Sequence, residues 1–150
     1  MDRARDGGAP MKAVSDALVG SWRLISYETR DSAGRAGRPY GAAAGRLTYD
    51  DRGQMSGQVM RPDRARVEVG VGNAQSVRAA YIGYIAYFGS YEVAPDGTSL
   101  VHRVEGALNP EWVGGEQVRK LRFDGDRLVL SADVRKGGDT VTHTLTWEKC

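Results

Sequence analysis

The chain has 150 residues, 41% of them hydrophobic and 27% charged, which is typical of one globular domain with its own hydrophobic core. This composition argues against a disordered or fibrous protein, and no apolar run approaches the roughly 20 residues of a membrane-spanning helix. The net charge of +2 comes from 21 basic and 19 acidic residues that alternate along the chain, which argues against nucleic-acid binding.

The N-terminal residues lead into no apolar stretch, so we expect no secretory signal. Cys150 is the single cysteine, which excludes an internal disulfide and a cysteine-based zinc site. We therefore expect a cytoplasmic protein without metal or cofactor. Residues 1–10 are predicted to form a mobile arm, and residues 11–150 a single domain.

The first part of this domain is predicted to be a short helix followed by strands. Apolar residues at helical spacing indicate a helix over residues 11–19, which Gly20 ends. Period-two alternation from Trp22 to Tyr27 then predicts a strand. Residues 32–45 form a loop rich in Gly and Ala, and a hairpin follows with strands at residues 46–49 and 54–61.

The segment from Asn73 to Phe88 is the best helix candidate, because Val77, Tyr81, Tyr84 and Phe88 fall on one helical face. We expect the helix near residues 73–86, running directly into a strand at about residues 87–93.

The rest of the chain reads as strands separated by turn signals such as Pro95-Asp96-Gly97. These strands are predicted at residues 99–108, 116–123, 127–134 and 140–148. About eight short strands indicate an antiparallel sandwich or barrel. We favour a closed up-and-down barrel, because short turns join consecutive strands and closure leaves no exposed edge. Such a barrel holds packed side chains or one small ligand.

Several motifs carry a family resemblance. Gly20-Ser21-Trp22 resembles the Gly-x-Trp signature of lipocalins and related calycins, in which the indole plugs the closed end of the barrel. Further matches, in order, span residues 19–149 and are similar to a bacterial and fungal lipocalin-like domain family. They include Gly45-Arg46-Leu47-Thr48-Tyr49, His102-Arg103-Val104-Glu105-Gly106, Pro110-Glu111-Trp112-Val113-Gly114 and Leu145-Thr146-Trp147-Glu148.

The resemblance implies a small barrel with a cavity and no agreed activity. Members of the family occur beside enzymes of secondary metabolism, and some barrels of similar architecture act as cofactor-free cyclases. Gly20 and Trp22 would form the structural plug.

The two histidines, His102 and His143, share parity with apolar residues on their strands. Each is either a hydrogen-bonded core residue or a general acid or base in an enclosed pocket. A single histidine could also bind haem, although no other sequence feature indicates haem binding.

Arg103 and Glu105 share the opposite face of their strand, and Arg119 lies beside Gln117 on the next one. These charged residues either face solvent or form a charge-compensated polar floor in the cavity, and parity alone does not decide between the two.

The aromatic residues Tyr81, Tyr84 and Tyr87, together with Trp112, are candidates for contact with a ligand or for core packing. Residues 61–66 are either a solvated, ion-paired turn or a clamp for an anionic group.

We carry two main hypotheses. The first is a module that binds a small, largely apolar molecule of polyketide or terpenoid type through Tyr81, Tyr84, Tyr87, Trp112, Gln117 and His143. The second is a cofactor-independent cyclase or isomerase of natural-product biosynthesis with His102, Glu105 and Arg119 as catalytic candidates. A third reading is an interaction protein whose outer face forms a homodimer.

Overall fold

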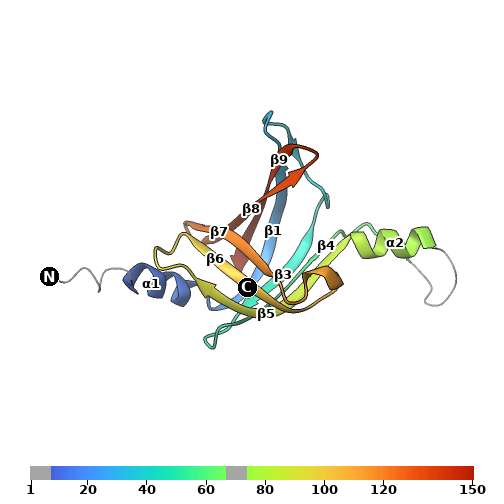
Figure 1. Ribbon diagram of the computed structural model, residues 1–150. Coiled ribbons are helices and arrows are strands. Elements are labelled where there is room, and N and C mark those ends of the chain that lie inside the picture. Colours follow the sequence, from blue (N-terminus) through green and yellow to red (C-terminus); the bar gives the residue numbers. More distant parts are fainter. Residues whose placement is uncertain (1–7, 67–73) are drawn as a thin grey trace.

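Consecutive strands pair antiparallel around the molecule, and strand β1 also pairs with β9, which closes the sheet into a barrel (Figure 1). This computed structural model describes residues 8–66 and 74–150. The strands are β1 (Gly20–Arg30), β2 (Ala36–Gly37), β3 (Ala44–Tyr49), β4 (Gln54–Met60), β5 (Tyr84–Val93), β6 (Ser99–Ala107), β7 (Glu116–Asp124), β8 (Arg127–Lys136) and β9 (Asp139–Lys149). The helices are α1 (Gly8–Leu18), α2 (Ala74–Ile82) and the short 3-10 helix η1 (Pro110–Trp112).

The prediction of a closed up-and-down barrel is confirmed, and the open sandwich is excluded by the β1–β9 pairing. Eight strands form the barrel. The additional strand, β2, lies in the segment predicted to be a loop and pairs only with the end of β1, at Thr29 and Arg30. No helix in the described ranges is long and apolar enough to cross a membrane.

The N-terminal helix α1 starts at Gly8 and ends at Leu18, so it begins earlier than the sequence predicts. Residues 1–7 of the expected arm lie outside the described residues. Leu18 is fully buried, and its carbonyl accepts a hydrogen bond of 2.8 Å from Nε1 of Trp22. This bond ties the end of α1 to the start of β1.

Trp22, near the start of β1, is 2% exposed and packs in one core cluster with Leu128 and Trp147. Nζ of Lys149 lies 5.3 Å from the centre of the Trp22 ring. Gly20 has a φ of +135°, a conformation that side chains with a Cβ rarely adopt. This glycine lets the chain turn from helix α1 into the barrel.

Helix α2 corrects the predicted helix, because it ends at Ile82 and strand β5 already begins at Tyr84. The aromatic and β-branched residues that follow Gly83 favour a strand, and β5 pairs along its length with β4. None of the described side chains of α2 is buried, and the helix projects away from the barrel (Figure 1). The helix therefore does not lie across the barrel mouth.

The barrel wall separates at two places toward the end opposite Trp22. Strands β1 and β3 pair only from Gly20 to Arg23, and strands β7 and β8 pair only from Lys120 to Asp124 on β7. Tyr40 bridges the first separation: its ring packs edge-on against Tyr27 with centroids 5.4 Å apart, and its hydroxyl donates to the carbonyl of Ile82 at 2.8 Å. The second separation forms one edge of the cavity described next.

Candidate functional site

The barrel encloses a cavity of about 560 Å³, which is within the usual range for small-molecule sites. Most of its wall is apolar, formed by Leu47, Met55, Val59, Ile85, Leu130, Leu145 and Trp147. Both edges of the separation between β7 and β8 also line it, through Val118, Arg119, Ala132, Asp133 and Val134. Val118 is 61% exposed and Val134 is 47% exposed, so the cavity opens to solvent there.

Strand register decides which polar residues enter the cavity. His102 pairs with Gln117 and Leu100 pairs with Arg119, so all four lie on the inner face of β6 and β7. His102 is 2% exposed, and His102, Gln117 and Arg119 line the cavity.

The outer face of β6 carries the other two charged candidates. Glu105 is exposed and does not line the cavity. Arg103 is exposed and forms ion pairs with Glu92 and Glu116 at 2.9 and 3.3 Å. The hypothesised polar floor of Arg103, Glu105 and Arg119 does not form, because the register leaves only Arg119 inside.

His102 lies between two tyrosine hydroxyls. Its Nε2 is 2.7 Å from the hydroxyl of Tyr49, and its Nδ1 is 2.6 Å from that of Tyr87. Tyr49 is 1% exposed, and within the described residues its hydroxyl has no partner other than His102. We therefore assign Tyr49 as the donor to Nε2, since otherwise its proton would be buried without an acceptor. His102 then donates its Nδ1 proton to Tyr87, and the hydroxyl proton of Tyr87 is left for another acceptor.

Burial keeps all three groups of this network neutral. It lowers the pKa of His102 to about 3, and the nearby positive charge of Arg119 adds to the effect. Burial also raises the pKa of Tyr49 well above its ordinary value. The pKa of Tyr87 is raised by burial too, although the charge and hydrogen bond of Arg119 oppose the rise. At neutral pH His102 is therefore an uncharged imidazole of low basicity whose two ring nitrogens are both hydrogen-bonded, which makes it a poor general base.

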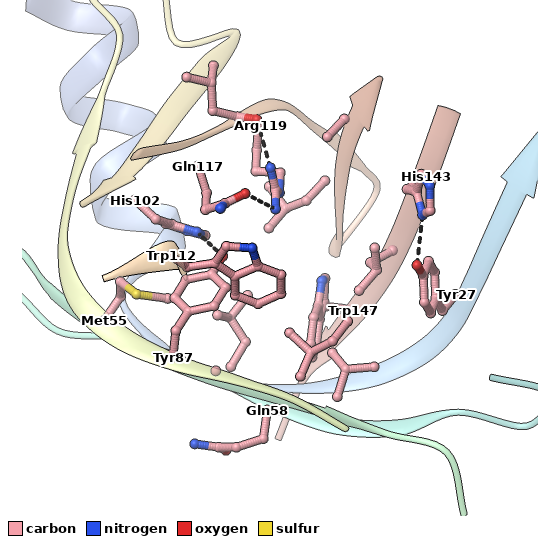
Figure 2. Close-up of a pocket in the computed structure, with 18 of the residues that line it drawn as sticks. Tyr27, Met55, Gln58, Tyr87, His102, Trp112, Gln117, Arg119, His143 and Trp147 are labelled. Atoms are coloured by element: carbon pink, nitrogen blue, oxygen red, sulfur yellow. Dashed lines mark hydrogen bonds between the residues drawn. The ribbon is translucent and has the colours of Figure 1, made fainter. Parts of the chain in front are cut away.

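A second histidine–tyrosine pair lies across the cavity, where Figure 2 shows His143 beside Tyr27 and well apart from His102. Nδ1 of His143 is 2.7 Å from the hydroxyl of Tyr27. Burial, followed by the charges of Arg119 and Lys136, lowers the pKa of His143. Burial raises the pKa of Tyr27 to about 12. This histidine–tyrosine pair is therefore polar and uncharged at neutral pH.

Arg119 is the cation of the cavity. It donates hydrogen bonds to Oε1 of Gln117 at 3.2 Å and to the carbonyl of Val118 at 3.0 Å. Within residues 8–66 and 74–150, no carboxylate forms an ion pair with it. The positive charge of the guanidinium lowers the pKa values of both histidines, so its electrostatic effect reaches both sides of the cavity.

The aromatic candidates separate into two groups. Tyr87 and Trp112 line the cavity and pack edge to face, with centroids 6.1 Å apart. Tyr81 is 40% exposed on α2 and does not line the cavity. Tyr84 does not line it either, and the guanidinium of Arg64 lies 5.0 Å from the centre of its ring.

The charged turn at residues 61–66 also lies outside the cavity lining, and Arg61 and Asp63 form an ion pair there at 2.9 Å. Conversely, sequence reasoning missed Tyr27, Tyr49 and Asp133. Period-two parity was the available signal for Tyr49, which is two residues from the buried Leu47.

The described ranges contain no group of three His, Cys, Asp or Glu side chains arranged to hold a metal ion. Haem does not fit at His102, because tyrosine hydroxyls occupy both of its ring nitrogens.

Comparisons with known proteins agree with this architecture. The 4'-hydroxy-3'-methoxypropiophenone carrier protein ppsC of Aspergillus oryzae is 34% identical, over an alignment that covers 63% of this chain and 96% of that protein. The family model described as a lipocalin-like domain matches residues 19–150. The matched region begins just before the Gly-x-Trp motif and includes every strand of the barrel, so this chain belongs to the lipocalin-like domain family.

Proposed function

We propose that this protein is a carrier that encloses one small, largely apolar organic molecule in its barrel. The observation that carries the proposal is the cavity of about 560 Å³, which has an apolar wall and a mouth between β7 and β8. At about 25 cal/mol per Å² of apolar surface removed from water, a guest that fills part of this wall reaches micromolar affinity.

The related Aspergillus protein supports the carrier function, because its name assigns it a small oxygenated aromatic ketone. We extend this class to the present chain as an aromatic or polyketide-type guest that bears oxygen substituents. The polar groups on both sides of the cavity suit such a guest, since each side offers hydrogen-bonding groups at the edge of an apolar wall. The proposal includes that the protein is cytoplasmic and carries this guest alongside enzymes of secondary metabolism.

Thermal unfolding with a ligand panel tests the proposal. The panel contains 4'-hydroxy-3'-methoxypropiophenone, flat polyketide-type aromatics and terpenoids. A ligand present at about 100 times its Kd stabilises the folded state by about 2.7 kcal/mol, which raises the Tm of a chain of this size by about 5–10 °C.

Ala132→Phe tests the cavity as the binding site, because Ala132 lines the cavity at its mouth and the larger ring fills part of it; Lys120→Phe is the matched control. The Ala132→Phe variant should fold and lose the ligand-induced shift. Lys120→Phe places the same ring on the exposed face of β7 and should keep the shift. If no compound raises the Tm of the unaltered protein, the carrier function is contradicted.

A cofactor-independent cyclase or isomerase is the second candidate. One observation favours it: the Tyr87 hydroxyl, whose proton is left free by the hydrogen-bond assignment above, lies beside Arg119. Such a donor pair stabilises negative charge that develops on a carbonyl oxygen. In this reading Tyr87 replaces His102 as the proton donor. Incubation of the bound compounds with the protein, followed by mass spectrometry and chromatography, tests it. Recovery of every guest unchanged would leave the carrier function alone.

A further inference from the structure

Hydrogen-bond donors gather on one side of the cavity. Tyr87, Trp112, Gln117 and Arg119 lie together in Figure 2, opposite the Tyr27–His143 pair, and we call these four residues the donor cluster. Three different elements supply them, since Tyr87 is on β5, Trp112 on η1, and Gln117 and Arg119 on β7.

The donor cluster retains several donors after its internal hydrogen bonds are counted. Tyr87 accepts from His102 and keeps its own proton free, as argued above. Gln117 uses its carbonyl oxygen to accept from Arg119, and within the described residues its amide N–H groups have no acceptor. The guanidinium of Arg119 has five N–H groups, so it keeps donors beyond its bonds to Val118, Gln117 and Tyr87. A guest that satisfies this cluster must therefore offer acceptor oxygens.

The charge balance of the cavity indicates that this acceptor is an anion. Arg119 is half-buried against an apolar wall and forms no ion pair within the described residues. Asp133 is the carboxylate that lines the cavity, but it lies at the mouth, where its Oδ1 accepts from Thr142 at 2.7 Å. A partly desolvated cation gains most from an opposite charge that is hydrogen-bonded to it.

We propose that the guest is an organic weak acid, bound as its anion, with an ionised oxygen against Arg119 and Tyr87 and an apolar body against the barrel wall. This inference rests on the proposed carrier function and names the chemistry of its ligand. A carboxylate, a phenolate and an enolate share this chemistry. The remaining titratable groups that line the cavity are Tyr27 on β1, His102 on β6, Asp133 on β8 and His143 on β9, and Tyr49 on β3 contacts His102 from the core.

A pair of probes with the same apolar body tests the carboxylate case. Naphthoate is an anion at neutral pH, and acetylnaphthalene is its uncharged counterpart. By isothermal titration calorimetry at pH 7, the unaltered protein should bind naphthoate at least tenfold more tightly than acetylnaphthalene. Arg119→Met should abolish this preference and still bind acetylnaphthalene. Arg122→Met should keep the preference, because Arg122 lies three residues along β7 on the exposed face.

The outcomes separate this inference from the carrier function. Binding of acetylnaphthalene with equal or weaker binding of naphthoate overturns the anion inference and leaves the carrier function standing. Binding of neither probe, together with no thermal shift from the ligand panel, overturns both. An anion preference that survives Arg119→Met overturns the role of Arg119.

A second probe, para-nitrophenol, tests the phenolate case by a spectroscopic signal, because its phenolate absorbs visible light. In the unaltered protein the pKa of the bound phenol should lie at least one unit below that of the free phenol, since Arg119 stabilises the phenolate. In Arg119→Met the pKa of the bound phenol should lie above that of the free phenol, because burial without a cation favours the neutral form. A raised pKa for the phenol bound to the unaltered protein contradicts the inference for phenols.

Discussion

The two histidines of the cavity both contact tyrosine hydroxyls, but their surroundings differ. His102 is 2% exposed and held from both ring nitrogens, by Tyr49 and Tyr87. His143 is half-buried, and Tyr27 contacts only its Nδ1. The comparison shows that the same combination of histidine and tyrosine occurs in two different environments, one deeply buried and one at the cavity wall. Deep burial makes His102 a structural support for Tyr87, whereas His143 lines the cavity with one ring nitrogen in contact with Tyr27.

The largest expected effect is a difference in stability between alanine variants of the two histidines. His102→Ala leaves the buried Tyr49 hydroxyl without its partner and opens a void in the core, so it should lower the free energy of unfolding by about 3–4 kcal/mol. His143→Ala removes one hydrogen bond at a half-exposed position and should cost about 1 kcal/mol. Urea unfolding at pH 7 measures both values. Equal costs for the two variants would contradict the comparison.

The pH dependence of stability should differ in the same way. Unfolded histidines titrate near pH 6.5, whereas the pKa of folded His102 is about 3. Between these values the unfolded state binds more protons, so the free energy of unfolding falls as the pH is lowered. For a single histidine the slope reaches about 1.4 kcal/mol per pH unit. Urea unfolding between pH 6.5 and about 4.5 measures this slope. That interval lies above the pH range in which most carboxylates titrate.

Matched variants assign this slope to one histidine. His102→Gln should lose most of the slope, and the glutamine side chain can still bond to a tyrosine hydroxyl, which favours folding of the variant. His143→Gln should retain most of it, although burial lowers the pKa of His143 as well. A slope that disappears with His143→Gln and persists with His102→Gln would reverse the assignment.

A smaller effect concerns the position of one proton on each ring. His102 is expected to carry its proton on Nδ1, because Tyr49 donates to Nε2. His143 is expected to carry its proton on Nε2, because the buried hydroxyl of Tyr27 is protonated at neutral pH and has no acceptor other than Nδ1 within the described residues. Nitrogen NMR chemical shifts at neutral pH distinguish the two tautomers. A proton on Nε2 of His102 would remove the argument that Tyr87 directs its proton into the cavity.

Period-two parity predicted much of this arrangement from the sequence. It placed His102 and His143 on the apolar faces of their strands, and the closed barrel followed from short turns between strands. Parity alone could not predict which residues of neighbouring strands lie opposite each other. The pairing of His102 with Gln117 fixes that relation, and it places Arg119 inside and Glu105 outside.

Two further features depend on tertiary context. The face of Tyr81, Tyr84 and Phe88 fits a helix by spacing, but pairing of β5 with β4 and β6 places Tyr84 and Phe88 on a strand. The mouth arises because β7 and β8 stop pairing at Lys120 while both strands continue with other partners. Residues such as Val118 and Asp133 line the cavity only because the wall separates beside them, and no local pattern reports that separation.

The smallest expected effect is that of Glu105, which shares strand β6 with His102 but faces solvent. Glu105→Gln should change the free energy of unfolding by less than about 0.5 kcal/mol and leave ligand affinity unaltered, because its carboxylate touches neither the cavity nor an ion-pair partner within the described residues. Urea unfolding and titration with naphthoate measure both quantities beside His102→Gln. A loss of affinity in Glu105→Gln would mean that charge on the outer face of β6 acts on the cavity, and the separation of the two faces would no longer explain the site.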